Sequence, residues 1–390
     1  MNKWEMKPLG QLCSIERGGS PRPIDKYITD SPDGINWIKI GDTTESMYIT
    51  STKEKIIPEG MKKSRYVQKG NFLLSNSMSF GRPYILDIDG CIHDGWLVIK
   101  DTHNLFDKRF LYYFLGSPVT YQKFKGMAVG GVVNNLNIDM VKKVEVPVLS
   151  MSEQKEIADS LDKVTALISS RKTQLEKLDQ LVKSRFIEMF GDAEKQVPLT
   201  DYVWFQEGPG VRSVDFTEEG TILLTGSNIN DNTISFGYKS DRHISDELAS
   251  GKYAHFMCDK DDILVVSSAI DPDKFDKKVV VVDVDKKYCL NTGIIRFKPN
   301  KQYLTIGYFR EFLKTDYFKH QVSSEMRGIA QMHFGPSHLK EMTILLPDSI
   351  EQQVEFELFV EQTDKLKFEV KQALEKLEIL KKSLMQKYFG

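Results

Sequence analysis

The sequence has few of the residues that build metal centres or disulfide frameworks. Its 390 residues include only four cysteines, and none stands in a Cys-x-x-Cys pair. That spacing argues against structural zinc and for buried free thiols. The seven histidines are scattered, which favours structural or surface roles. An acidic run at 259–262 lacks the glycine and distal glutamate of a calcium-binding loop, so a solvated turn is the better interpretation. We expect no metal site.

Catalytic motifs are also missing. The chain has no Gly-x-x-x-x-Gly-Lys-Ser/Thr phosphate loop, no Asn-Pro-Pro-aromatic or Asp-Pro-Pro-aromatic motif, and no clear nucleophile–base constellation. We therefore predict no catalytic and no cofactor-binding residues. Neither a charged, apolar leader nor an apolar run near the roughly twenty residues that span a bilayer is present. A cytoplasmic location without membrane contact is expected.

The charge balance argues against a protein that binds DNA strongly on its own. The net charge is −2. Residues 1–150 carry +4 (20 Lys and Arg against 16 Asp and Glu), whereas residues 193–348 carry −4 (19 against 23). A chain that neutralised many phosphates by itself would be more basic. Either it does not bind DNA, or a partner supplies much of the positive charge.

What the sequence does contain is an internal duplication. An apolar stretch with a proline leads into Glu153-Gln154 and a long helical pattern that ends at 190–191, and the same order recurs before Glu351-Gln352 and ends at 389–390. Matching positions are displaced by 190 near the start, as in Gly18 and Gly208, and by 198 later, as in Cys91 and Cys289. An insertion of about seven residues therefore lies in the second copy, around 271–278. Two such copies predict two comparable binding faces.

Two long helices are predicted, each starting at a capping box. Ser150-x-x-Glu153 and Ser349-x-x-Gln352 have the spacing in which both side chains satisfy backbone donors at a helix start. Residues then recur at alternating steps of four and three, the period of a coiled-coil seam. Each helix would be about 58 Å long at roughly 1.5 Å per residue. Packing of each helix on its own block is the alternative, but duplication in register favours a helix pair. The predicted seams are Ile157, Leu161, Val164, Ile168, Leu175, Leu178, Val182 and Met189, and Phe359, Leu366, Val370, Ala373, Leu377, Leu380 and Leu384.

The two blocks are predicted to be mixed α/β and mostly β. Short β-rich runs such as 37–40, 72–74, 96–99, 263–266, 279–284 and 294–297 alternate with Gly, Asn, Asp and Pro. One helical segment interrupts each block, near 110–115 and 308–318. The predicted fold is thus α+β: two tandem, pseudo-twofold-related domains (1–150 and 193–348) separated by two long antiparallel helices (151–192 and 349–390) that form a coiled coil.

Candidate recognition residues lie in polar loops that correspond between the copies. Glycines in these loops permit close backbone approach, and their cations, hydroxyls and amides suit contacts to phosphates and base edges. The alternative for each is a solvated turn or a side chain that caps the backbone. The first loop pair supplies Arg17, Ser20, Arg22, Arg212 and Ser213; the second supplies Asn76, Ser77, Ser79, Arg82, Ser267, Ser268, Lys274 and Lys277; the third supplies Lys125, Asn134, Asn135, Arg327, Gln331 and His333.

These features together resemble the specificity subunit of type I restriction-modification systems. The resemblance rests on the double block, the proline followed by Glu-Gln at each long helix, and the Gly-x-x-x-Asn-Asn-Leu segment at 130–136. It covers essentially the whole chain and depends on order and spacing rather than on one short motif.

The resemblance implies a subunit without catalytic activity. Its two target-recognition domains would each read half of an interrupted, asymmetric site in double-stranded DNA, while the helices set the spacer and dock two methyltransferase (modification) subunits. Restriction subunits would complete the complex. S-adenosylmethionine, and ATP with magnesium for restriction, would be bound by these partners. Two alternatives are a structural adaptor that binds proteins and the recognition subunit of another multisubunit restriction system.

Overall fold

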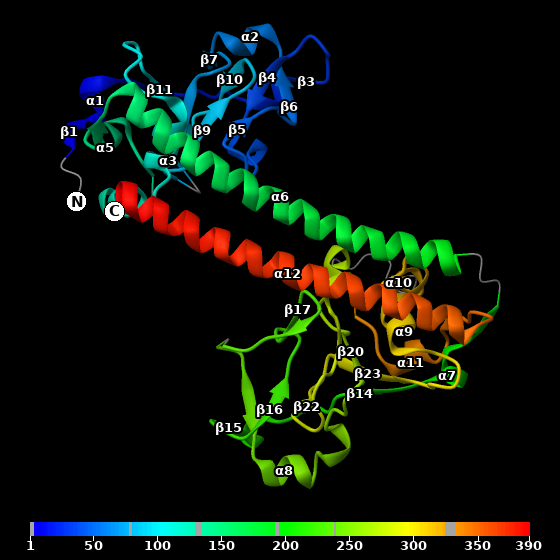
Figure 1. Ribbon diagram of the computed structural model, residues 1–390. Coiled ribbons are helices and arrows are strands. Elements are labelled where there is room, and N and C mark those ends of the chain that lie inside the picture. Colours follow the sequence, from blue (N-terminus) through cyan, green and yellow to red (C-terminus); the bar gives the residue numbers. More distant parts are fainter. Residues whose placement is uncertain (1–3, 78–79, 129–134, 192–194, 238, 324–332) are drawn as a thin grey trace. The chain divides into compact units, whose positions relative to one another are not determined.

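The computed structural model describes residues 4–77, 80–128, 135–191, 195–237, 239–323 and 333–390. The chain divides into two compact units, unit 1 (Met1–Lys172 and Gln372–Gly390) and unit 2 (Thr173–Lys371). Two helices of 40 residues, α6 (Met151–Phe190) and α12 (Ile350–Phe389), each contribute one part to each unit (Figure 1). This confirms the predicted fold class. The division into four domains stays a prediction.

Unit 1 contains two five-stranded sheets and a separate antiparallel pair. The sheets have the strand orders β3-β6-β4-β10-β7 and β2-β11-β8-β9-β5, and β1 pairs with β12. The helices α3 (Lys108–Leu115), α4 (Pro118–Met127) and α5 (Ile138–Lys142) contribute to a core with the second sheet. The strands are β1 Glu5–Pro8, β2 Ser14–Arg17, β3 Ile28–Thr29, β4 Ile35–Ile38, β5 Tyr48–Ile49, β6 Glu54–Ile56, β7 Arg65–Val67, β8 Phe72–Ser75, β9 Pro83–Leu86, β10 Gly90–Ile92, β11 Trp96–Lys100 and β12 Glu145–Val148.

Unit 2 repeats this plan with shorter sheets. The orders are β14-β23-β20-β21 and β15-β19-β16-β22, with β13 paired to β24 and a small hairpin of β17 and β18. The shorter helices of unit 2 are α7 (Leu199–Tyr202), α8 (Asp246–Ser250), α9 (Ile306–Phe312), α10 (Asp316–Ser323) and α11 (Pro336–Leu339). The strands are β13 Gln196–Pro198, β14 Val203–Glu207, β15 Phe216–Thr217, β16 Thr221–Leu224, β17 Ile229–Asn230, β18 Thr233–Ile234, β19 Arg242–Ile244, β20 Ile263–Val266, β21 Val279–Val281, β22 Tyr288–Leu290, β23 Ile294–Pro299 and β24 Thr343–Leu345.

Strand registers place matching residues of the two copies at matching positions. In unit 1 Val98 lies opposite Leu73, and in unit 2 Arg296 lies opposite Leu264. The matched glycines also serve the same purpose: a Cβ on Gly18 would lie 2.1 Å from the His93 carbonyl oxygen, and one on Gly208 would lie 2.2 Å from that of Asn291. Only glycine, which has no Cβ, can lie this close to a neighbouring backbone.

Several predicted segments differ from the structure. The strand expected at 37–40 is β4, which ends at Ile38 because a 3₁₀ turn starts at Ile40. Each block contains several helices instead of the one expected. The strand expected at 279–284 ends at Val281. The single helix expected at 308–318 is two helices, because Thr315 starts a new one: its hydroxyl donates to the Phe312 carbonyl at 2.6 Å and accepts from the Phe318 N–H at 3.3 Å. Such local side-chain bonds compete with helix continuation.

The starts of the long helices match the capping prediction, completely for α6 and partly for α12. The Ser150 N–H donates to the Glu153 carboxylate at 3.0 Å, and the Glu153 N–H donates back to the Ser150 hydroxyl at 3.3 Å. At α12 the Gln352 N–H donates to the Ser349 hydroxyl at 3.4 Å, but that hydroxyl bonds Glu351 instead of Gln352.

Within each unit the two long helices run antiparallel, as predicted. In unit 2, Asp179 pairs with Lys367 and Arg185 pairs with Glu355, so later residues of α6 meet earlier residues of α12. In unit 1 the start of α6 and the end of α12 share one core, which contains Phe389. Phe389 packs edge-on against Phe110 and Phe114 of α3.

The seam predicted for α12 is wrong at several positions. Leu366 and Leu380 are 51% and 44% exposed, whereas the neighbouring Lys367 side chain is only 19% exposed. Long lysine stems can cover apolar surface while the ammonium remains solvated or paired. A search for apolar residues alone therefore chooses the leucine beside the true seam position. The buried face includes Val370, as predicted, together with Gln353, Phe356, Val360 and Thr363.

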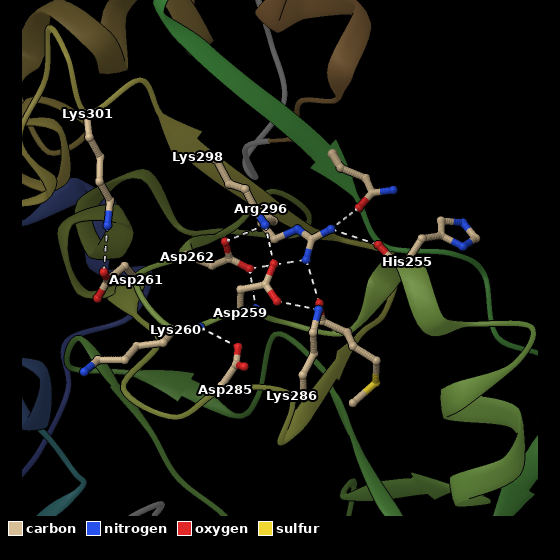
Figure 2. A network of polar contacts seen from close by, with 12 residues as sticks. His255, Asp259, Lys260, Asp261, Asp262, Asp285, Lys286, Arg296, Lys298 and Lys301 are labelled. Atoms are coloured by element: carbon tan, nitrogen blue, oxygen red, sulfur yellow. Dashed lines mark hydrogen bonds and ion pairs between the residues drawn. The ribbon is translucent and has the colours of Figure 1, made fainter.

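A buried ion pair distinguishes unit 2 from unit 1. The Arg296 guanidinium points toward Asp262 (Figure 2). The two groups are 3.2 Å apart, and their side chains are 4% and 2% exposed. The guanidinium also donates to the Met257 and His255 carbonyls at 2.7 and 2.9 Å. Burial, opposed by these charges, raises the pKa of Asp262. The unit 1 position equivalent to Arg296 is the apolar Val98. Equivalent strands therefore place different side chains in the interiors of the two units.

Candidate nucleic-acid interface

Backbone hydrogen bonds bring the three predicted loops of unit 1 together. The Leu136 N–H, which ends the third loop, donates to the Asn76 carbonyl of the second at 2.9 Å. Asn76 in turn donates to Gly95 O at 2.9 Å, and Gly18 of the first loop donates to Trp96 O at 2.9 Å. Both of these acceptors lie at the start of β11. The loops therefore share one edge of the unit.

Unit 2 contains the same set of bonds. The Phe334 N–H donates to Ser267 O at 2.9 Å, Ser267 donates to Gly293 O at 2.8 Å, and Gly208 donates to Ile294 O at 3.0 Å. The backbone frame is thus duplicated, while the side chains on it differ. This is the arrangement expected of two faces that read different partners with one scaffold.

Asp94 organises the cluster in unit 1, and the sequence analysis did not identify it. Its carboxylate accepts from the Ser20 hydroxyl at 2.9 Å and lies 3.5 Å from the Arg22 guanidinium. Its backbone carbonyl accepts from Arg17 Nε at 2.9 Å and from the Asn76 amide at 3.1 Å. Burial would raise the pKa of Asp94, but the Ser20 bond and the neighbouring cations lower it overall. No motif marks this aspartate, because its partners lie more than fifteen residues away.

The predicted residues of unit 1 differ in accessibility. The Arg22 side chain is 82% exposed, whereas Asn76 is 2% exposed and its side-chain oxygen has no partner among the described residues. Ser77 is half-buried, and Arg17, Arg82, Lys125 and Asn135 are exposed. No contact joins Lys125, in the last turn of α4, to the Asp94 cluster. Ser79 and Asn134 fall outside the described residues.

In unit 2 the second and third loops meet through side chains as well. The His333 ring nitrogen lies 3.0 Å from the Ser268 hydroxyl. Ser267 is fully buried, and its hydroxyl has no partner among the described residues. Arg212 and Ser213 are exposed at a short 3₁₀ turn, Ser213–Asp215. Arg327 and Gln331 fall outside the described residues.

The two inserted lysines of unit 2 are exposed and paired. Lys274 lies 3.3 Å from Asp271, and Lys277 lies 3.4 Å from Asp231, with lysine side chains 68% and 62% exposed. Exposed pairs of this kind contribute little to stability. Both ammonium groups can therefore exchange their carboxylate for a phosphate at low cost.

The exposed side chains of the interface have the chemistry to bind a nucleic acid. Across the described ranges, no group of three or more His, Cys, Asp or Glu side chains could hold a metal ion. No helix in the same ranges is long and apolar enough to cross a membrane. Exposed arginines, lysines, amides and hydroxyls on a rigid frame can contact both phosphates and base edges.

Comparison with known proteins agrees with this chemistry. Residues 1–180 and 195–379 match the family model described as the type I restriction modification DNA specificity domain. The type I restriction enzyme MjaVIII specificity subunit of Methanocaldococcus jannaschii is 21% identical, covering 90% of this chain and 84% of that protein. The EcoBI specificity subunit of Escherichia coli is 23% identical, and the match covers 100% of this chain and 86% of that protein.

Solved structures share the fold. The S subunit of a type I system from M. genitalium superposes with a TM-score of 0.57 at 17% identity, covering 100% of this chain and 97% of that one. A second structure, described for complex assembly of the type I R-M system, gives a TM-score of 0.55 at 14% identity.

Proposed function

Because the chain belongs to the type I restriction-modification DNA specificity family, we propose that it is the non-catalytic subunit that reads an interrupted, asymmetric sequence in duplex DNA. Each loop cluster reads one half-site. Methyltransferase and restriction subunits supply the chemistry, together with S-adenosylmethionine and, for restriction, ATP and magnesium.

One observation carries this proposal: the loop frame is duplicated, but its side chains are not. Asn76 and Ser267 make equivalent backbone bonds in the two units. At equivalent positions of the two frames, Arg17 corresponds to Glu207 and Asn76 corresponds to Ser267. Base edges differ in their donors and acceptors, so different side chains on one frame recognise different bases.

The long helices have a length that suits setting the distance between the two half-sites. Each has 40 residues, which corresponds to about 60 Å at roughly 1.5 Å per residue. One turn of DNA is about 34 Å. A matched insertion of seven residues in both helices, two turns, adds about 10 Å and should widen the unread spacer by about three base pairs. An unchanged spacer would contradict the proposal that helix length sets the distance between the half-sites.

Exposed leucines at equivalent positions support docking of two methyltransferase subunits. Unit 2 exposes Leu181 (48%) and Leu366 (51%), and unit 1 exposes their repeat counterparts, Leu380 (44%) and Leu167 (49%). In unit 2 the Asp179–Lys367 ion pair puts Leu181 and Leu366 at the same level of the helix pair. Apolar side chains exposed in matched pairs indicate a protein contact.

Docking can be tested one unit at a time. Changing Leu181 and Leu366 to serine should release one of the two methyltransferase subunits, which native mass spectrometry would count. Ile187→Ser is the matched control, since Ile187 is 67% exposed on α6 and its repeat counterpart is Gln386. Retention of both subunits in the double variant would contradict this docking surface.

The function itself is tested by co-expression with the cognate methyltransferase subunit and mapping of methylated adenines. Methylation within one interrupted, asymmetric motif is expected. Exchange of residues 1–150 for the corresponding block of another member should change one half of that motif. A change in both halves would contradict the modular proposal, and no complex at all would favour a protein-binding adaptor.

A further inference from the structure

Unit 1 contains a groove at the end of the second loop, which supplies Phe80 and Arg82 to its lining. Its volume is about 540 Å³, and it lies between the start of β9, the helices α3 and α4, and the last turns of α12. Tyrosines and a phenylalanine line it, and Phe80 stacks on Tyr121 with ring centroids 5.8 Å apart. Arg82 and Lys381 add two cations.

Both cations lack a protein partner. Among the described residues neither the Arg82 guanidinium nor the Lys381 ammonium has a hydrogen bond or an ion pair. The carboxylate in the lining, Glu45, is bound instead to Lys172 at 2.9 Å. Burial and the nearby Lys172 charge lower the pKa of Lys381. The groove therefore offers aromatic surface and two cations, of which Lys381 interacts at longer range with a carboxylate, Glu45, and this suits an anionic ligand with an apolar part.

The repeat shows what occupies the equivalent place in unit 2. The Ser75 N–H donates to Arg82 O, and the equivalent Val266 N–H donates to Lys278 O. Arg82 thus corresponds to Lys278, and Phe80 corresponds to Asp276. Unlike Arg82, Lys278 is saturated: its ammonium donates to Ile229 O at 2.9 Å and to the Asn230 side chain at 2.7 Å.

Asp276 closes the equivalent position with its carboxylate. It pairs with Lys319 of α10, which corresponds to Tyr121, and with Lys183 of α6. An ion pair in unit 2 therefore replaces the Phe80–Tyr121 stack of unit 1. It also ties the block to the long helix, a contact that Phe80 cannot make. Asp276 thus supplies in unit 2 a carboxylate where unit 1 has the phenyl ring of Phe80.

We propose that the unit 1 groove binds an acidic segment of the methyltransferase subunit, whose carboxylate takes the place that Asp276 holds in unit 2. This rests on the proposed function and deepens it: the two docking sites are unequal, because one is completed by the chain itself and the other by its partner. An aromatic or aliphatic side chain beside the carboxylate would pack on Tyr112 and Tyr121.

Acetylation of lysines, read by mass spectrometry, tests the site in the full chain. Binding of the methyltransferase subunit should protect Lys381 several-fold more than Lys376, which is exposed on α12 and does not line the groove. Protection by duplex DNA alone would show a phosphate site and overturn the proposal. A stable complex with Lys381 still reactive would also overturn it, while leaving the specificity function intact; no complex would count against that function instead.

Charge reversal gives a second measurement. Lys381→Glu should weaken binding of one methyltransferase subunit by about tenfold or more, while the other stays bound. Lys376→Glu is the matched control, at an exposed position outside the groove, and should leave both affinities within about twofold. Equal effects of the two variants, or loss of both bound subunits from Lys381→Glu alone, would contradict an unequal groove. Circular dichroism checks that both variants fold.

Discussion

The side-chain oxygen of Gln154 accepts a hydrogen bond of 2.9 Å from the backbone N–H of Asp107, and its amide donates to the Leu105 carbonyl at 2.8 Å. Unit 2 repeats this contact: Gln353 accepts from the Thr305 N–H at 3.0 Å and donates to the Tyr303 carbonyl at 2.9 Å. Both glutamines are 1% exposed. The duplicated glutamines are therefore Gln154 and Gln353, one position from the pairing of Gln154 with Gln352 that the sequence suggested.

Gln154→Ala should destabilise unit 1 by about 1–3 kcal/mol, because it removes a buried side chain and leaves the Asp107 N–H and the Leu105 carbonyl without their side-chain partner. Amide hydrogen exchange localises the effect: Asp107 should exchange faster and Thr305 should not. The control is Gln352→Ala, at an exposed position, which should change stability by no more than about 0.5 kcal/mol. Faster exchange at Thr305 in the Gln154 variant would show that the contact acts beyond its own unit.

Removal of the Asp262 carboxylate should cost unit 2 about 3–5 kcal/mol, since Arg296 would remain buried without a counter-charge. Urea denaturation of Asp262→Asn measures this loss. The unit 1 counterparts of Asp262 and Arg296 are Asn71 and Val98. The repeat therefore suggests that a second substitution, at Arg296, compensates for the loss of the Asp262 carboxylate. The double variant Asp262→Asn with Arg296→Val should recover much of the loss. A double variant no more stable than the single one would show that the rest of the pocket needs the guanidinium.

Acid should weaken unit 2 through Asp259. Hydrogen bonds from Lys286 and Lys298 lower the pKa of Asp259 to about 2. A carboxyl whose folded pKa is depressed stabilises the fold above its unfolded pKa of about 3.8 and loses that contribution as the pH falls towards 2. The stability difference between the wild type and Asp259→Asn should therefore shrink between about pH 4 and pH 2. A difference that stays constant over this window would contradict the assignment.

Asp94→Ala should relax sequence preference at one half-site only. Without the carboxylate, Ser20 and Arg22 lose the acceptor that holds them, and the first loop becomes free to adopt other positions. Sequencing of methylated sites should show degenerate bases in one half of the motif and an intact second half. His333→Ala is the reciprocal variant, because it removes the Ser268 contact of unit 2. Degeneracy in the same half for both variants would contradict separate readers.

Much of the fold could be predicted because each pattern in the first half of the sequence could be compared with its copy in the second half. Periodicity located α6 and α12, and the matched Gly18 and Gly208 marked close backbone approaches that only glycine allows. Prediction was weakest where polar side chains lie inside. Lys367 lies on the buried face in place of Leu366, and Arg296 replaces Val98 in the core; neither substitution follows from hydropathy.

The sequence predicted which loops form the candidate site, but not how the side chains of these loops are arranged. Glycine, asparagine and serine clusters indicated the three segments, yet nothing in the sequence singled out Asp94 as their common partner. Buried candidates such as Asn76 and Ser267 could not be separated from exposed ones, because burial depends on which distant segment covers each loop. Their roles at DNA stay predictions.

The sequence by itself determined the duplicated plan, the two long helices and the lack of catalytic motifs, because periodicity, capping and repeat spacing are local properties of a chain. Only the tertiary structure decided which polar groups pair across that plan. Asp94 with Ser20, Asp262 with Arg296 and Asp276 with Lys183 join residues more than thirty positions apart. Such pairs form when folding brings distant segments together, and their strength depends on the burial that results.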